Sequence, residues 1–148
     1  MKIGFDALLL TGYYSGVEIC ISRLLERLAT IPFEHEMTVF MRNTHDLPKM
    51  PENISIRHVS VGNKLSRLFF QHFRLGSRAV RENCDLLHCP GYIKGISGSL
   101  PYILNVHDTI ALRNPELCTR SNHWHYRLFM TRSIRSAAMI ITPSRSVK

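Results

Sequence analysis

The sequence predicts an α/β protein with a Rossmann-like, doubly wound parallel sheet and helices on both faces. Short apolar runs alternate with segments of helical period along the 148 residues. Most runs are separated by enough chain for a crossover helix, which parallel neighbours require. Hydrophobic residues make up 45% and charged residues 20%, which is typical of a chain with a real core. The length fits one domain over residues 1–148.

The first strand, turn and helix are read from residues 2–28. The apolar run "KIGFDALLL", residues 2–10, predicts a buried strand, and "TGYYSG", residues 11–16, predicts a turn. Ser15 is a plausible N-cap, with Glu18 three residues on as in a capping box. The helix that follows has apolar residues at intervals of three and four: Val17, Cys20, Ile21, Leu24, Leu25 and Leu28.

The middle of the chain predicts two strands and a long helix. Residues 36–42 and the alternating run 54–61, which suits a sheet edge, are the second and third strands. A helical period then covers 64–82. One face of that helix is formed by Leu65, Leu68, Phe69, His72 and Phe73.

The last third predicts three more strands and one helix. The strands are residues 85–90, 100–106 and 138–144. Between them we expect a glycine- and serine-rich loop over 92–99, a loop over 109–122 and a helix over 123–137.

The charge of the chain is uneven. Net charge is +8, from 19 basic and 11 acidic residues, and no acidic residue follows Glu116. A second basic stretch runs from Lys64 to Arg81. Such surfaces attract polyanions, although a simple solvated cationic face is the alternative. Nucleic acid is not an expected partner, because no recognition motif accompanies the charge.

Cysteine usage and the amino-terminal residues bear on the compartment. The four cysteines form no C-x-x-C pair, so we interpret them as reduced and structural. No stretch approaches the ~20 apolar residues that span a bilayer, and the first ten residues do not have the pattern of a signal peptide. We therefore expect a cytoplasmic protein, soluble or peripheral at the inner membrane face.

Ligands of open parallel sheets bind at the carboxyl ends of the strands, and four segments end there. In the first, Gly12 and Gly16 let the backbone approach an anion at the start of the helix that begins near Val17. The spacing is neither G-x-G-x-x-G nor a Walker loop, and a plain turn is the alternative. In the second, "HCPGY", Pro90 and Gly91 shape a wall and Tyr92 could stack on a sugar or base, with a simple turn as the alternative.

The third and fourth segments carry His107, Asp108 and Ser144. Adjacent strand residues point to opposite sides, so we expect His107 toward a substrate and Asp108 to hold the following loop or helix. The alternative is a histidine satisfied in the core. Ser144 caps a following helix or touches a ligand.

Two kinds of chemistry are poorly supported. The eight histidines offer no H-E-x-x-H, and no C-x-x-C pair exists, so we expect no metal. A serine hydrolase would need a G-x-S-x-G elbow, which the chain lacks.

Four segments in order resemble the N-terminal domain of a GT-B glycosyltransferase of the retaining family 4. They are "KIGFDALLL" with "SGVEICISRLLERL", "CDLLHCPGY", "LPYILNVHDTIAL" and "RSIRSAAMIITPSRSVK". The chain departs from the family pattern where Glu18 replaces a usual glycine, Met139 a usual aspartate and Pro143 a usual valine. The Glu18 departure questions close phosphate approach at the first turn.

The resemblance implies sugar transfer from a nucleotide-sugar donor to a glycan or lipid-linked acceptor, with no other cofactor. Carried over by position, His107 would lie by the transferring sugar with Asp108 supporting it. Donor phosphates would meet Gly12, Gly16, Val17 and Ser144. The acceptor would meet Tyr14, Pro90, Gly91 and Tyr92.

In this family the nucleotide and an E-x7-E element belong to a C-terminal domain that the chain lacks. We therefore expect the acceptor-side half of an enzyme, weak or inactive without that domain or a partner chain that supplies it. The alternative hypothesis is a non-catalytic basic module that binds anionic membrane or a phosphorylated glycan.

Overall fold

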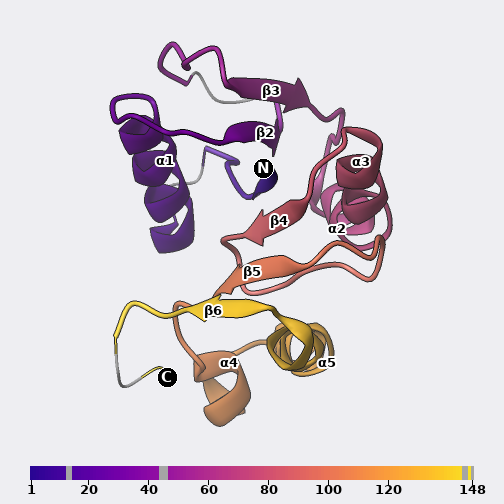
Figure 1. Cartoon of the computed structure of the whole chain (residues 1–148). Helices are drawn as coiled ribbons and strands as arrows, with labels where there is room; N and C mark the ends of the chain where they lie inside the picture. Colours follow the sequence, from indigo (N-terminus) through magenta and orange to yellow (C-terminus); the bar gives the residue numbers. More distant parts are fainter. Residues whose placement is uncertain (13–14, 44–46, 145–146, 148) are drawn as a thin grey trace.

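The computed structural model describes residues 1–12, 15–43, 47–144 and 147. A six-stranded sheet in the order β3-β2-β1-β4-β5-β6 forms its centre, and every neighbouring pair is parallel (Figure 1). The strands are β1 (Lys2–Ala7), β2 (Glu36–Met41), β3 (Ile54–His58), β4 (Leu86–Cys89), β5 (Tyr102–Asn105) and β6 (Met139–Ile141). The predicted Rossmann-like α/β fold is confirmed.

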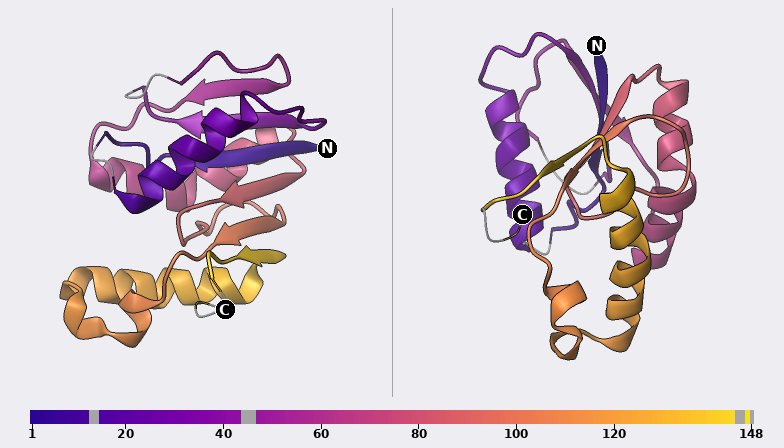
Figure 2. Two further views of the ribbon diagram at one scale, coloured as in Figure 1. Left: turned by 90° about the vertical axis from the view of Figure 1, so that its left-hand side faces the viewer. Right: turned by 60° about the horizontal axis from the view of Figure 1, so that its bottom comes forward.

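Helices cover both faces of the sheet. α1 lies on one face, and α2, α3 and α5 lie on the other (Figure 2). The helices are α1 (Gly16–Leu28), α2 (Lys64–Phe73), α3 (Leu75–Arg81), α4 (Ile110–Arg113) and α5 (Arg120–Ser136), with a 3-10 turn η1 (Pro115–Leu117). Within the described ranges, no helix combines the length and the apolarity needed to cross a membrane.

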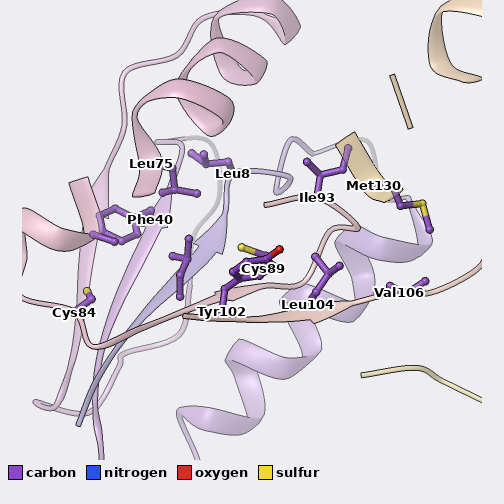
Figure 3. Packing of buried hydrophobic residues seen from close by; sticks show 12 residues of the cluster. Leu8, Phe40, Leu75, Cys84, Cys89, Ile93, Tyr102, Leu104, Val106 and Met130 are labelled. Atoms are coloured by element: carbon purple, nitrogen blue, oxygen red, sulfur yellow. The ribbon is translucent and has the colours of Figure 1, made fainter. Parts of the chain in front are cut away.

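Two apolar clusters separate these layers. Alternate residues of β2 point to opposite faces, so Val39 packs under α1 while Phe40 packs under the other helices. Leu25 of α1 belongs to the cluster with Val39. Leu104 of β5 belongs to the cluster with Phe40, which Figure 3 shows. Burying each such side chain contributes about 1.5–3 kcal/mol, which makes these clusters the main source of stability.

The helix predicted over residues 64–82 is broken. Arg74, with φ −126° and ψ −34°, ends α2 and precedes α3. The break frees the carbonyl of His72, which accepts N–H bonds from Ile96 at 2.8 Å and Ser97 at 3.1 Å. Gly76 lies so close to this loop that a Cβ there would be 1.9 Å from the carbonyl oxygen of Ser97. The loop after β4 therefore docks on the break by backbone contact.

The face of α2 that its apolar pattern indicated is buried only in part, because only His72 is buried and Leu68 half-buried. Leu65 and Phe69 are 76% and 54% exposed, and Phe73 is exposed too. The buried residues of α2 are Arg67, Gln71 and His72. The physical reason is that this side of α2 meets Asp6 of β1 and the aromatic rings of α5 instead of aliphatic strand residues.

Two smaller expectations are also corrected. The loop predicted over residues 109–122 contains α4 and η1, and α5 begins at Arg120, where Thr119 Oγ1 accepts the N–H of Asn122 at 3.3 Å. Cys20 is exposed on α1 and so does not share the buried stripe of that helix. The cysteines of the described ranges are free thiols, with Cys84 and Cys89 buried.

Candidate functional site

The carboxyl ends of β1, β4 and β5 meet at one edge of the sheet. These three strands are adjacent and parallel, as the predicted site requires. Leu9, just after β1, packs on Gly91, just after β4, where an added Cβ would lie 2.2 Å from Leu9 Cδ1. The glycine turn and the "HCPGY" segment are therefore brought together, and a side chain at position 91 would have to displace Leu9.

His107 stands at this edge, directly beyond β5. Its Nε2 lies 2.7 Å from the carbonyl oxygen of Pro90. A carbonyl can only accept, so Nε2 carries the proton and Nδ1 of the neutral ring is left as an acceptor. The ring is half-buried, with its edge against Tyr92 at 5.3 Å between centroids. The imidazole is thus held in one orientation without being buried in the core.

Asp108 links the loop after β4 to the start of α4. Its Oδ2 accepts the Tyr92 hydroxyl at 2.5 Å, and its Oδ1 accepts the N–H of Ile110 at 3.0 Å. This agrees with the expectation that Asp108 holds the following segment. Tyr92 has φ +63° and donates its own N–H to Asn105 at 3.1 Å. Burial, and then Asp108, raise the pKa of Tyr92, so the phenol stays protonated and donates.

A cavity of about 220 Å³ lies behind this pair. Tyr92 and Asp108 form its polar wall, and Ala111, Cys118 and Tyr126 belong to its apolar wall. Tyr92, Asp108, His107, Pro90 and Gly91 therefore form one group, which we call the His107 group.

The glycine turn already holds a carboxylate. Gly12 has φ +88°, which favours glycine, and its N–H donates to Glu18 Oε1 at 2.5 Å. The N–H of Thr11 donates to the same oxygen, and Thr11 Oγ1 donates to Glu18 Oε2 at 3.3 Å. Burial alone would raise the pKa of Glu18, but the N–H groups of Gly12 and Thr11 outweigh it and the net pKa is lowered. A side chain of the protein therefore occupies the anion-binding N–H groups of this turn.

The remaining predicted residues are spread along the same edge. Gly16 begins α1, and no described atom lies within 4 Å of its Cβ position. Val17 packs against the apolar cluster under α1. Ser15 Oγ accepts the N–H of Glu18 at 3.3 Å, as a predicted cap. Ser144 follows β6, and Tyr14 lies outside the described residues.

A second, basic cavity was not foreseen from the sequence. It measures about 500 Å³ and lies beyond β1 and β2, beside the start of α2. Its lining residues are Leu9, Thr11, Ser15, Glu18, Arg42, Gly62, Asn63, Lys64 and Arg67. Sequence reasoning placed Lys64 and Arg67 in a basic stretch that attracts polyanions or is simply solvated, and it did not foresee that Arg67 is only 9% exposed.

A buried polar chain runs from Arg67 into the sheet. Arg67 Nη1 donates to Gln71 Oε1 at 3.2 Å, and Gln71 Nε2 donates to Asp6 Oδ2 at 2.7 Å. Asp6 Oδ1 accepts the N–H of Leu8 at 3.1 Å. Burial raises the pKa of Asp6, although the hydrogen bonds from Leu8 and Gln71 lower it in part. A signal for this site was present in the charged residue at position 6 inside an apolar strand.

His88 has a structural role, and the described residues offer no metal site. His88 Nε2 pairs with Asn105 Oδ1 at 2.8 Å across β4 and β5, and burial lowers the pKa of His88. Among the described residues, no three His, Cys, Asp or Glu side chains are placed to hold a metal ion.

Comparisons with known proteins add a family assignment. The sequence profile of Glycosyltransferase Family 4 matches residues 14–148, which is nearly the whole chain. A search of curated proteins found no significant match. The matched span includes β2 to β6 and every residue of the His107 group.

Proposed function

Because the chain belongs to Glycosyltransferase Family 4, we propose that it forms the acceptor-side half of a GT-B enzyme. That enzyme transfers a sugar from a nucleotide-sugar donor to a glycan or lipid-linked acceptor with retention of anomeric configuration. The observation that carries the proposal is the His107 group at the carboxyl edge of the sheet. There the Pro90 carbonyl orients an imidazole whose second nitrogen remains an acceptor.

The division of roles follows from the contacts. His107 Nδ1 accepts a hydrogen bond from a hydroxyl of the transferring sugar, or interacts with charge that develops on it. Asp108 positions Tyr92 and α4 at the edge of the site. Pro90, Gly91 and Tyr92 form the wall on which the acceptor lies.

At the donor end, the phosphates approach the open amino end of α1 at Gly16 and Val17. They do not use the N–H groups of Thr11 and Gly12, which Glu18 already fills.

The 148-residue chain alone transfers sugar weakly or not at all under this proposal. Holding donor and acceptor together supplies much of the rate of a two-substrate reaction. Family 4 enzymes place the nucleotide on a C-terminal domain, and this chain has no dinucleotide or Walker fingerprint of its own. That domain, or a partner chain that provides it, is the expected partner.

The test is a transfer assay with nucleotide sugars and lipid-linked or glycan acceptors, with and without an added GT-B C-terminal domain. We expect turnover only with the added domain, and a product with the anomeric configuration of the donor by NMR. His107→Ala should then lower kcat by about 10²-fold. His58→Ala, an exposed histidine on β3, is the matched control and should not change kcat.

Two outcomes would contradict this proposal. Robust turnover by the 148-residue chain alone would show that the chain needs no second half. Unchanged turnover in His107→Ala would remove the histidine from the site.

One observation favours a second candidate function, docking on an anionic membrane. Leu65, Phe69 and Phe73 form an exposed apolar stripe on α2, and Trp124 and Leu128 are exposed on α5. The two helices pack together through His72 and Phe129, whose rings lie 4.2 Å apart. Exposed cations adjoin both stripes: Lys64, Arg74, Arg127 and Arg135. Aromatic and apolar side chains flanked by cations suit the interface of a bilayer. For a cytoplasmic protein, that interface would be the inner face of the membrane.

Co-sedimentation with vesicles tests this docking. We expect binding to vesicles with phosphatidylglycerol, weaker binding to neutral vesicles, and loss at ~0.5 M salt. Phe69→Ser should weaken it, whereas Ile19→Ser, an exposed apolar residue on α1 at the opposite face, should not. Equal loss in both variants would contradict a specific docking face.

A further inference from the structure

We propose that the basic cavity lined by Arg42, Lys64 and Arg67 binds the acceptor through a phosphate group, either a monoester or a diester. The proposal rests on the proposed sugar transfer, and it names the chemical class of the acceptor. It goes beyond the His107 group, because the cavity lies on the other side of Leu9, beyond β1 and β2.

Among the described residues, the three cations of the cavity form no ion pair with a carboxylate. The ion pairs of the described ranges join other residues, on α1 and between β3 and α3. Arg67 is nine-tenths buried, and its Nη1 donates to the neutral amide of Gln71. Burying a charge costs several kcal/mol; Asp6, reached through Gln71, offsets part of that cost, and a bound anion in the cavity would offset more.

Arg42 gives an independent indication. Its Nε is buried and, within the part of the chain that the structure describes, has no hydrogen-bond partner. Its Nη2 reaches the carbonyl of Gly62 only at 3.5 Å. Burial lowers the pKa of Arg67, Asp6 and then Tyr126 raise it in part, and the positive charge of Arg42 lowers it further, so the two guanidinium groups repel each other. A bound anion would supply the missing acceptor and relieve this repulsion.

The start of α2 adds to the same field. Lys64 is its first residue, and no acidic residue stands in its first turn. The positive end of a helix dipole favours acidic side chains, so a cation here opposes the stability of the helix. Asn63 and Ser66 already satisfy each other's N–H groups in a capping box. The start of α2 therefore contributes positive potential to the cavity through the helix dipole and the charge of Lys64.

The carboxylate in the wall does not cancel this charge. Glu18 is the acidic residue among those that line the cavity, and its oxygens are bonded to Thr11 and Gly12. Three cations thus face one carboxylate that already has its donors. The volume of about 500 Å³ lies within the usual range of ligand sites and leaves room for the group that the phosphate carries.

The position relative to the reaction fits an acceptor. Leu9 lines the cavity and also packs on Gly91, the neighbour of the Pro90 that holds His107. A molecule anchored by its phosphate in the cavity would extend along the carboxyl edge toward that histidine.

The experiment measures binding of sn-glycerol 3-phosphate to the 148-residue chain by calorimetry or NMR, with glycerol as the neutral control. We expect glycerol phosphate to bind and glycerol not to bind. Lys64→Met and Arg67→Met should each weaken binding by about tenfold, the effect of one charge-assisted contact. Arg81→Met removes the same charge from an exposed position on α3 and should change affinity less than about twofold.

Lys64 is exposed, so Lys64→Met keeps the test valid even if Arg67→Met fails to fold. Two further arms distinguish the sources of the phosphate. If vesicles with phosphatidic acid compete with glycerol phosphate, the phosphate belongs to a lipid headgroup. If glycerol phosphate binds and the vesicles do not compete, the acceptor is soluble.

Absence of phosphate binding, or equal loss in Arg81→Met, would overturn the cavity as a phosphate site. UDP or GDP that binds more tightly than glycerol phosphate and depends on Lys64 would assign the cavity to the donor and overturn its assignment to the acceptor. Failure of the proposed function is separable from this result. Cavity-dependent binding without any sugar transfer would overturn the transferase and leave an anion site, whereas transfer without such binding would overturn the cavity alone.

Discussion

Helices α1 and α2 lie on opposite faces of the same sheet and differ in what they bury. α1 buries Ile21, Leu25 and Leu28, together with one charged residue, Glu18, whose oxygens are fully bonded. α2 buries Arg67, Gln71 and His72 and exposes Leu65, Phe69 and Phe73. α1 therefore has the arrangement that favours stability. α2 has an arrangement that costs stability and leaves polar and apolar groups available for ligands.

The largest expected difference is between matched apolar truncations. Leu25→Ala removes a fully buried side chain of α1 and should lower the free energy of unfolding by about 3 kcal/mol. Phe69→Ala on α2 removes an exposed ring and should cost less than about 1 kcal/mol. Chemical denaturation of both variants gives the two values. Equal costs would mean that the stripe on α2 is covered in solution.

Glu18 provides the next contrast. Glu18 is only 2% exposed, and Glu18→Ala leaves the N–H groups of Thr11 and Gly12 without their acceptor. We expect a loss of about 2–3 kcal/mol. Glu26→Ala, on the half-exposed side of the same helix, is the control and should cost about 0.5 kcal/mol or less.

The pH dependence of stability follows from the lowered pKa of Glu18. Its contribution is present above the ordinary value of 4.5 and is lost as pH falls through the lower value in the folded protein. Glu18→Ala should remove this part of the acid sensitivity. A pH profile identical to that of the unaltered protein would contradict the role of the carboxylate.

His72 predicts a different pH window for α2. Burial, and then His125 and Arg67, lower its pKa from 6.5 to about 4, and neither ring nitrogen has a partner among the described residues. Protonation therefore favours the unfolded chain, so stability is complete above about pH 6.5 and falls as the pH drops toward 4. We expect a loss of about 2 kcal/mol across this window.

Denaturation at a series of pH values measures this loss. His72→Leu should reduce the slope above pH ~4.5 without removing it, because burial also lowers the pKa of His88 and of His125. His58→Leu, at an exposed histidine, should leave the profile unchanged. A slope in His72→Leu equal to that of the unaltered protein would assign the titration to another group.

The smallest expected effect has opposite signs on stability and binding. Lys64→Glu places an acidic residue at the positive end of α2, as Glu18 stands in the first turn of α1, and should raise stability by about 0.5 kcal/mol. The same change should abolish binding of glycerol phosphate. Thermal unfolding and calorimetry on one preparation check both signs. A variant that loses stability would contradict an electrostatic cost at this helix end.

Much of the fold could be predicted because its signals are local. Apolar runs bounded by glycine and proline marked all six strands, and crossover lengths implied a parallel sheet. The break at Arg74 could not be seen, because it depends on a loop twenty residues later that takes the carbonyl of His72. The exposure of Leu65, Phe69 and Phe73 was missed for a similar reason, since periodicity identifies a face without saying what it meets.

Only part of the candidate site could be predicted from the sequence, for the same reason. The placement of His107 beside Pro90 follows from strand ends, and the sequence predicted it correctly. The basic cavity combines residues that follow β2, begin α2 and precede α1, and no pattern links Arg42 to Arg67. The Glu18 contact also depends on the fold of the turn, although its unusual residue type was a visible signal.

The backbone contact between α3 and the loop after β4 has a consequence for how sequences of this kind should be compared. Gly76 touches Ser97 and Gly98, at distances where no side chain fits, and it does so in place of a crossover helix between β4 and β5. Relatives that keep this short connection should keep small residues at position 76 and in the facing segment 97–98, however much their acceptors differ. Invariant small residues there would reflect the close backbone packing of this short connection. Interpreting them as catalytic residues would place the reaction centre wrongly.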